Sequence, residues 1–336
     1  MEDDMMLQVI DVEGEAQLVF AGAGDNVINA VESNGQNRLD GGTGDDTFLL
    51  GTGDRIFGGA GSDRFFVQTG GNNRITGGAG ADQFWIANNG TIPISPNRVT
   101  DFDSEEDVIG LEGFGTDFNA LEIIQQGTDT LIAIDGSPLA LLENIDANQL
   151  SEANFALVEP GQNGEPDPAT LPADMDAPVF DSLTGMTFEL ANQKRLDASG
   201  MNDLIDASTG DHRRSILKGR GGDDTFIVGE NDRLTGGNGS DRFFVQSEGG
   251  NRLNGGAGAD QFWIAVGDIP EQRNIVLDFT DGEDVLGIAG LGIGFNQLEI
   301  QQGRNNQTSI SLDGDVLAVL RNTSSDVISE ADFAII

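Results

Sequence analysis

A nine-residue repeat of the form G-G-x-G-x-D-x-U-x, where U is a large apolar residue, most strongly limits how this chain can fold. The repeat occurs, with one departure, as GGTGDDTFL (41–49), GGAGSDRFF (58–66), GGAGADQFW (77–85), GRGGDDTFI (219–227), GGNGSDRFF (236–244) and GGAGADQFW (255–263). The glycines permit positive φ angles, and the last three positions favour a short strand with one inward side chain. Each nonapeptide is therefore predicted to form one turn and one strand.

Weaker repeats lie between the regular ones and keep the inward apolar residue. These apolar positions recur every 8 to 12 residues, at Ile28, Leu39, Phe48, Ile56, Phe65, Ile75 and Phe84, and at Ile205, Leu217, Phe226, Leu234, Phe243, Leu253 and Phe262. In a right-handed parallel coil with two strands per rung, regular and weak turns would fall on opposite edges. The pattern therefore predicts an all-β fold with two unlike edges.

The residue that ends each turn differs between the two predicted edges. Regular turns end at Asp46, Asp63, Asp82, Asp224, Asp241 and Asp260, and weak turns end at Asn37, Asp54, Asn73, Ser215, Asp232 and Asn251. Asparagine keeps a carbonyl oxygen but lacks the charge that dominates the affinity for hard cations. We expect strong cation sites on the first edge and weak or empty sites on the second.

The repeats resemble those of the repeats-in-toxin (RTX) family of calcium-binding proteins. The resemblance implies parallel β-rolls in which each Ca²⁺ lies between two stacked turns. The implied ligands are positions 2, 4 and 6 of one turn and positions 1, 3 and 6 of the next. In this sequence they are Gly42, Gly44, Asp46, Gly58, Gly59, Ala60, Gly61, Asp63, Gly77, Ala79, Asp82, Arg220, Gly222, Asp224, Gly236, Gly237, Asn238, Gly239, Asp241, Gly255, Ala257 and Asp260. At least four ions per chain are implied, and Arg220, which replaces a glycine, would fit only with a negative φ.

The net charge favours a cation independently of this resemblance. The chain has 57 acidic and 17 basic residues, for a formal net charge of -40. Rows of aspartates at a rung spacing of about 4.8 Å would repel one another unless neutralised, so ion binding and folding should be linked. Such a surface would also repel nucleic acid and anionic membranes. We expect calcium ions as partners, no nucleic acid and no membrane insertion.

The chain contains two copies of one domain. Residues 41–85 and 219–263 align without a gap and are identical at about two thirds of their positions, and the similarity continues to LSEANFALV and ISEADFAII. Five of the nine prolines lie between the copies, as is typical of an extended linker. We expect a first roll with its cap at 1–158, a linker at 159–182 and a second roll with its cap at 183–336.

Each repeat array is followed by a β-rich extension. Apolar runs flank Asp135-Gly136 and Asp313-Gly314, which are hairpin signals, and the hairpins would cap an open sheet edge. Asp101, Asp103 and Asp107 precede the first extension. This cluster is interpreted as either a further calcium site or a capped, solvated strand end.

Position 9 of the regular repeats should face outward, yet it holds large apolar residues. They are Leu49, Phe66, Trp85, Ile227, Phe244 and Trp263. They could pack against the extension or the other copy, or form a stripe that binds a protein or glycan partner. On the other sheet, Arg38, Arg55 and Arg74 are expected to neutralise nearby aspartates.

No set of catalytic residues is evident. The chain has no cysteine and one histidine, His212, which argues against thiol and histidine catalysis. We expect a calcium-binding extracellular protein with a structural or binding role and no enzymatic activity. The alternatives are a cell-surface adhesion or glycan-binding component, or a hydrolase with a carboxylate pair between the copies.

The two ends of the chain bear on secretion. The stretch from Met1 to Asp4 lacks the basic and apolar regions of a cleavable signal peptide. The acidic and apolar end, Glu330 to Ile336, resembles the uncleaved export signals of RTX proteins, although Glu152 to Val158 has the same character at an internal position. We expect secretion by a signal-peptide-independent (type I) route.

Overall fold

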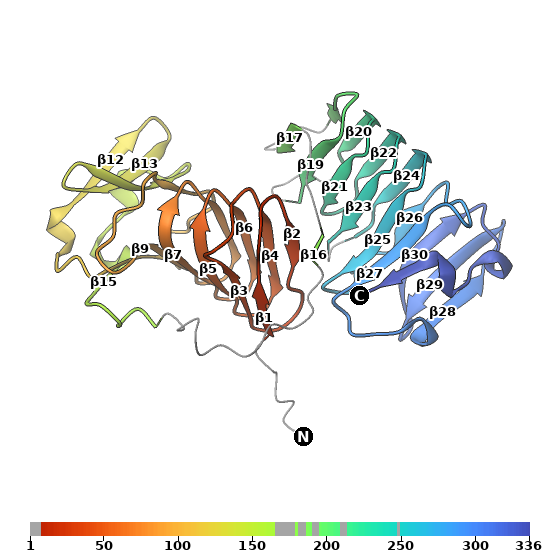
Figure 1. Ribbon diagram of the computed structural model, residues 1–336, viewed down its shortest axis with the longest axis horizontal. Helices are drawn as coiled ribbons and strands as arrows, with labels where there is room; N and C mark the ends of the chain where they lie inside the picture. The colour runs from red at the N-terminus through yellow and green to blue at the C-terminus, as the bar shows by residue number, and fades with distance from the viewer. Residues whose placement is uncertain (1–7, 165–178, 181–185, 190–194, 209–213, 247–248) are drawn as a thin grey trace, which may run out of the picture. The chain divides into compact units, whose positions relative to one another are not determined.

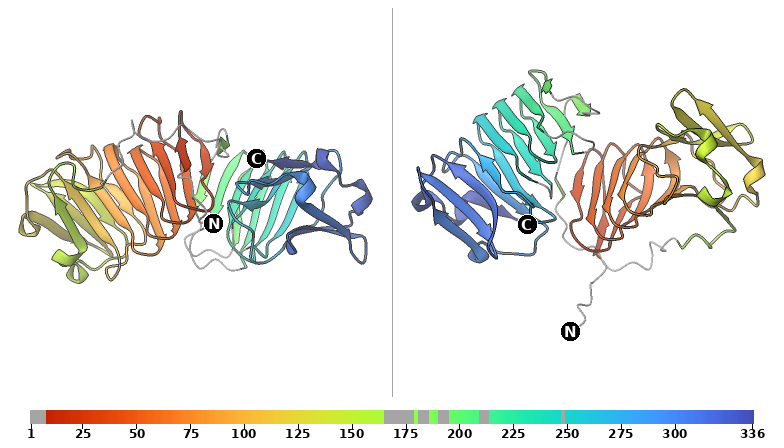
Figure 2. Two further views of the ribbon diagram at one scale, coloured as in Figure 1. Left: turned by 90° about the horizontal axis from the view of Figure 1, so that it is seen from below. Right: turned by 180° about the vertical axis from the view of Figure 1, so that it is seen from behind.

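The computed structural model describes residues 8–164, 179–180, 186–189, 195–208, 214–246 and 249–336. Contacts within the chain divide it into two units, Met1–Ser182 and Leu183–Ile336, and each is described by itself. The strands of each unit lie side by side in layers (Figure 1; Figure 2). All helices among the described residues are single 3₁₀ turns, and none is long and apolar enough to cross a membrane. The prediction of an all-β parallel roll is confirmed.

The first unit consists of two sheets. One sheet has the order β1 (Gln8–Asp11), β3 (Asn26–Ala30), β5 (Thr47–Thr52), β7 (Arg64–Gly71), β9 (Gln83–Ala87), β11 (Val108–Glu112) and β15 (Phe155–Val158). The other has the order β12 (Leu121–Gln126), β13 (Asp129–Ile134), β14 (Ser137–Leu142), β10 (Asn97–Val99), β8 (Arg74–Ala79), β6 (Arg55–Ala60), β4 (Arg38–Thr43), β2 (Leu18–Phe20) and β16 (Val179–Phe180). Consecutive coil strands alternate between the sheets, so successive turns lie on opposite edges.

The second unit repeats this arrangement. Its first sheet has the order β17 (Met186–Glu189), β19 (Asp203–Ala207), β21 (Thr225–Val228), β23 (Arg242–Val245), β25 (Gln261–Val266), β27 (Val285–Ala289) and β31 (Phe333–Ile335). Its second sheet has the order β18 (Arg195–Asp197), β20 (Ile216–Gly221), β22 (Arg233–Asn238), β24 (Arg252–Ala257), β26 (Asn274–Val276), β30 (Asp315–Arg321), β29 (Gln307–Leu312) and β28 (Leu298–Gln302). The duplicated sequence therefore gives two units with corresponding strand orders.

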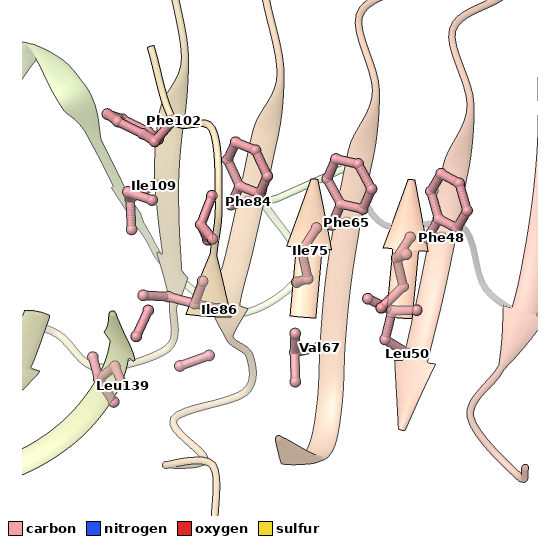
Figure 3. Close-up of a cluster of buried hydrophobic side chains, with 14 of the residues drawn as sticks. Phe48, Leu50, Phe65, Val67, Ile75, Phe84, Ile86, Phe102, Ile109 and Leu139 are labelled. Atoms are coloured by element: carbon pink, nitrogen blue, oxygen red, sulfur yellow. The ribbon is translucent and has the colours of Figure 1, made fainter. Parts of the chain in front are cut away.

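The inward apolar positions form a stacked core. Phe48, Phe65 and Phe84 are fully buried, and their rings are stacked with centroids 5.0 and 5.1 Å apart (Figure 3). Phe226, Phe243 and Phe262 stack in the same way in the second unit, at 4.8 and 5.3 Å. Parallel pairing in register places identical residues above one another, so the rings fill the coil and hold the turns in register.

Each extension forms the predicted hairpin. In the first unit β12, β13 and β14 pair antiparallel, and Asp135 at the tip has a φ of 49°. Strand β14 then pairs with β10 of the coil in parallel. The cap therefore continues the second sheet beyond the last coil strand.

The position 9 residues face away from the core, as expected, and they are packed rather than exposed. Phe66 is fully buried and Trp85 is 4% exposed, in a cluster separate from the core that also contains Val9, Val27 and Leu49. The Trp85 ring fits because Gly110 lies beneath it, where a Cβ would overlap the indole. The second unit buries Ile227, Phe244 and Trp263 equally well. These residues are packed, so they do not form an exposed binding stripe.

The arginines on the second sheet lie beside acidic groups or aromatic rings. The Arg38 side chain is buried, lies 2.9 Å from Asp40 and stacks over Phe57 at 4.1 Å. Arg74 and Arg98 both contact Glu143, at 2.9 and 2.8 Å. Arg38 neutralises an aspartate, as expected from the sequence, whereas Arg74 pairs with Glu143 instead.

Candidate calcium site

The aspartates of the regular turns form a hydrogen-bonded ladder along one edge of each unit. The backbone N–H of Asp46 donates to Oδ1 of Asp63 at 2.8 Å, and that of Asp63 donates to Oδ1 of Asp82 at 2.8 Å. Asp82 donates in turn to Asp107 at 2.9 Å. One carboxylate oxygen of each ladder aspartate is thus used to bind the preceding rung.

The other carboxylate oxygen has no protein partner. Oδ2 is buried and accepts no hydrogen bond in Asp46, Asp63, Asp82, Asp224 and Asp241. A buried acceptor left in this state costs roughly 1–3 kcal/mol, and more for a charged group. Repeated in both units, the feature indicates that these oxygens suit a small cation.

These oxygens lie close to glycines and to carbonyl oxygens of adjacent turns. A Cβ added to Gly58 would overlap Oδ2 of Asp63 and the carbonyl oxygen of Gly77, and one added to Gly41 would overlap Oδ2 of Asp46. Gly59 and Gly61 have φ angles of 115° and 138°, which residues with a side chain rarely adopt. The glycines therefore leave room for carboxylate and carbonyl oxygens to converge.

Backbone carbonyls must supply most of any ligand set. Among the described residues, no three acidic or imidazole side chains come together as in a side-chain metal site. The carbonyl of Ala60 accepts one hydrogen bond from Gly44 at 2.8 Å, and that of Ala79 accepts one from Gly61 at 2.9 Å, which leaves each a lone pair. Carbonyls with one or two carboxylates are the hard oxygen donors that Ca²⁺ prefers.

The acidity of the ladder supports the same conclusion. Burial raises the pKa of Asp63 to about 8, and the charges of Asp46 and Asp82 act in the same direction, against the lowering effect of its backbone hydrogen bond. Burial likewise raises the pKa of Asp46 and of Asp82 to about 7. At neutral pH these carboxyls would hold protons to a large extent unless a cation supplied the opposing charge.

The second unit has the same ladder with one added member. Burial raises the pKa of Asp241 to about 7 and those of Asp224 and Asp260 to about 6. The ladder begins at Asp203, whose Oδ1 is buried without a partner. Asn26 stands at this place in the first unit and donates its amide to the carbonyl of Gly24 at 2.8 Å. The site prediction omitted Asp203, although its alignment with Asn26 contains the signal.

Arg220 does not meet the condition set from the sequence. Its φ is 85°, the same left-handed region that glycine occupies at this motif position. The guanidinium lies 3.8 Å from Asp197 and is largely exposed. The turn geometry therefore overrides the preference of an L-residue, at the cost of local strain.

Both carboxylate oxygens of Asp107 are used where the first ladder ends. Oδ1 accepts from Asp82 at 2.9 Å and Oδ2 from Asp103 at 2.8 Å. The Asp101 carboxylate accepts from the backbone of Gly77 and Gly78, at 2.9 Å each. These bonds favour the second interpretation of the cluster, a capped strand end.

The opposite edge is built from amides. The side chain of Asn73 donates to the carbonyl of Gly51 at 3.1 Å, and that of Asn251 donates to the carbonyl of Gly229 at 2.7 Å. Asn37 donates to Asp54, whose pKa burial raises to about 6. An amide N–H thus takes the place of a cation at Asn37, Asn73 and Asn251. Asp232 differs, because its Oδ2 is buried without a partner.

The fold and this site define a calcium-binding parallel β-roll. A family model described as the RTX calcium-binding nonapeptide repeat matches residues 33–54, 51–67, 69–85 and 246–263. The chain therefore carries RTX repeats. Repeats of this kind bind Ca²⁺, which confirms the predicted cofactor.

The comparison with curated proteins gave no match. Among solved structures, the chain is similar to the extracellular lipase LipA from Serratia marcescens, with 17% sequence identity and a TM-score of 0.22. The match covers 93% of this chain and 40% of the lipase chain, so this chain spans less than half of that protein.

Proposed function

We propose that the chain is an extracellular calcium-binding protein whose two rolls fold, or gain most of their stability, when Ca²⁺ binds. The observation that carries this proposal is the row of buried Oδ2 atoms without partners, which occurs in both units. A cation that binds only the folded rolls would stabilise them in proportion to its concentration. The protein would then have a structural or binding role rather than a catalytic one.

In this proposal each ion joins two successive regular turns. The first would be held by Gly42, Gly44 and Asp46 with Gly58, Ala60 and Asp63. The next would be held by Gly59, Gly61 and Asp63 with Gly77, Ala79 and Asp82. The corresponding residues of the second unit are Arg220, Gly222, Asp224, Gly236, Gly237, Asn238, Gly239, Asp241, Gly255, Ala257 and Asp260. Asp63 and Asp241 would each serve two ions, so binding within a unit should be cooperative.

An extracellular location fits the chemistry of these sites. Calcium modules that work outside cells bind in the 10⁻⁴ to 10⁻³ M range. Sites dominated by neutral carbonyls, with carboxylates that must first lose protons, suit that range. Secretion by a signal-peptide-independent route is part of the proposal. An exposed glycan-binding stripe is not, because Phe66 and Trp85 are buried.

The test is a calcium titration of chelator-treated protein, followed by circular dichroism and calorimetry, with Mg²⁺ as the control ion. We expect β signal to appear cooperatively with at least four Ca²⁺ per chain and not with Mg²⁺, which demands a stricter geometry. A chelated protein that is already fully folded and binds fewer than two ions would overturn the proposal.

A further inference from the structure

The chain that leaves the first cap does not run free into solvent. Residues 159–164, here called the strap, follow β15 as the light green trace in Figure 1. The backbone N–H of Gly161 donates to Glu112 at the end of β11, and the side chain of Asn163 donates to Asn88, just after β9, at 3.2 Å. The Gly164 carbonyl accepts from Arg64, at the start of β7, at 3.3 Å. The strap thus contacts three successive strands of one sheet.

These three anchors lie around the buried outer cluster. Phe66 lies in β7 and Trp85 in β9. The strap is held at the ends of β11 and β9 through Gly161 and Asn163, and at the start of β7 through Gly164. The Arg64 guanidinium lies over the Phe66 ring at 6.0 Å and also donates to Thr47 at 3.0 Å. The anchors of the strap therefore lie close to the two aromatic residues on the same sheet.

The anchors are built into the coil. Glu112 is 2% exposed, and its other carboxylate oxygen accepts from the backbone of Asn89 at 3.1 Å. Asn88 is 1% exposed and also donates to the carbonyl of Val67 at 2.8 Å. A buried polar group is tolerated when its hydrogen bonds are satisfied, and the strap provides one hydrogen bond to each of these side chains. None of these bonds involves an oxygen of the aspartate ladder.

The second unit has different residues at the two main anchor positions. The strand register places Ala289 and Val266 where the first unit has Glu112 and Asn88. Neither side chain can form such a hydrogen bond. The Glu112 and Asn88 anchors are therefore specific to the first unit, whereas Arg242 takes the place of Arg64 in the second. Trp263, the equivalent of Trp85, is also 4% exposed, so its burial does not depend on these two anchors.

We propose that the strap is the occupant of the outer face of the first roll, where it covers Phe66 and Trp85 and holds β7, β9 and β11 together without calcium. The segment between the copies thus begins as part of the first roll. The aromatic stripe is an internal docking surface for the chain's own segment and is closed to an external partner.

The test uses the two tryptophans as separate reporters. In a Trp263→Phe background only Trp85 fluoresces, and the double variant Glu112→Ala with Asn88→Val gives the first roll the anchor residues of the second. In saturating Ca²⁺ we expect acrylamide to quench Trp85 about threefold more strongly, because the cover is released. Unchanged quenching with an unchanged circular dichroism spectrum would overturn the proposal.

A second variant distinguishes loss of the strap contacts from misfolding of the roll. Asn163→Ala alters the strap and leaves the coil untouched, so the fold should persist while quenching of Trp85 rises by a smaller factor. Asn148→Ala is the matched control, since that amide bonds only to Asp146 within the cap. If neither the double variant nor Asn163→Ala increases quenching, the strap does not cover Trp85. All measurements are made with calcium present, so this failure is distinct from failure of calcium-linked folding.

Discussion

The two edges of each roll differ in how their buried carboxylate and carbonyl oxygens find a partner. On the first edge, a buried aspartate oxygen such as Oδ2 of Asp63 faces the carbonyl of the next turn with no donor between them. On the second edge, the amide of Asn73 donates directly to a turn carbonyl. Amide hydrogens close one edge within the protein, whereas the other edge needs a positive charge from solution. The second edge of the first coil is therefore closed without an ion, whereas Asp232 leaves one such oxygen open in the second coil.

The largest expected effect comes from replacing carboxylates by amides on the first edge. The double variant Asp63→Asn with Asp241→Asn removes a carboxylate shared by both proposed ions in each unit, so calorimetry should show loss of nearly all calcium binding. In chelator, however, the variant should melt at a higher temperature than the wild type, because the amide can donate as Asn73 does and one charge is removed.

The control changes the same charge on the other edge. Asp54→Asn should leave the calcium stoichiometry unchanged, since Asp54 already receives hydrogen bonds from Asn37. If Asp54→Asn lowered calcium binding as much as Asp63→Asn, the two edges would be equivalent and the comparison would be wrong.

The response to pH should also separate the edges. Burial raises the folded-state pKa of Asp63 to about 8 and that of Asp241 to about 7, from 3.8 in the unfolded chain. The folded state therefore binds more protons, and this contribution to stability is complete below pH 4 and lost as pH rises through 6 to 8. Calcium-free protein prepared on a chelating resin should melt at a higher temperature at pH 5 than at pH 8.

Saturating calcium should flatten or reverse this pH dependence, because the ion displaces the protons. The second edge contributes less, because its asparagines do not titrate and burial raises the pKa of its two aspartates, Asp54 and Asp232, only to about 6. A calcium-free melting temperature that rises between pH 5 and pH 8 would contradict protonation of the ladder.

Replacing an amide by a carboxylate on the second edge should change stability by a smaller amount. Asn73→Asp places a second carboxylate beside Asp54 and leaves the Gly51 carbonyl without its donor. In chelator we expect a loss of about 1–3 kcal/mol in the free energy of unfolding, part of which calcium restores. Asn73→Ala is the matched control, since it loses the donor without gaining a ligand and should not be rescued by calcium. Equal responses to calcium by the two variants would refute a latent site.

Much of this arrangement could be predicted from the sequence because the repeat fixes both register and chemistry. The period placed Phe48, Phe65 and Phe84 in the core, and the Asp and Asn alternation separated the edges. The position 9 residues were correctly placed on the outer face, but inward and outward alternation cannot decide whether that face is packed or exposed. Burial of Phe66 and Trp85 depends on Gly110 and on cover for the outer face, and neither follows from a nonapeptide.

The strap was missed, and the opening rung was left out of the predicted sites, for a similar reason. Glu112 lies outside the repeats, and its contact with Gly161 joins residues that are far apart in sequence. Asp203 belongs to an irregular turn that the motif does not describe. Short repeats predict local geometry, whereas these features depend on contacts between residues that are far apart in the sequence.

The smallest expected effect distinguishes the first edges of the two units. Arg220 has a φ of 85° where Gly42 has 96°, so an L-residue carries left-handed strain in one unit only. Arg220→Gly should raise the free energy of unfolding of the calcium-bound protein by about 1 kcal/mol. Arg220→Ala removes the charge near Asp197 but keeps the Cβ, and should give no such gain. A gain of equal size in both variants would assign the cost to charge rather than to backbone strain, and would leave the two edges equivalent in their turn geometry.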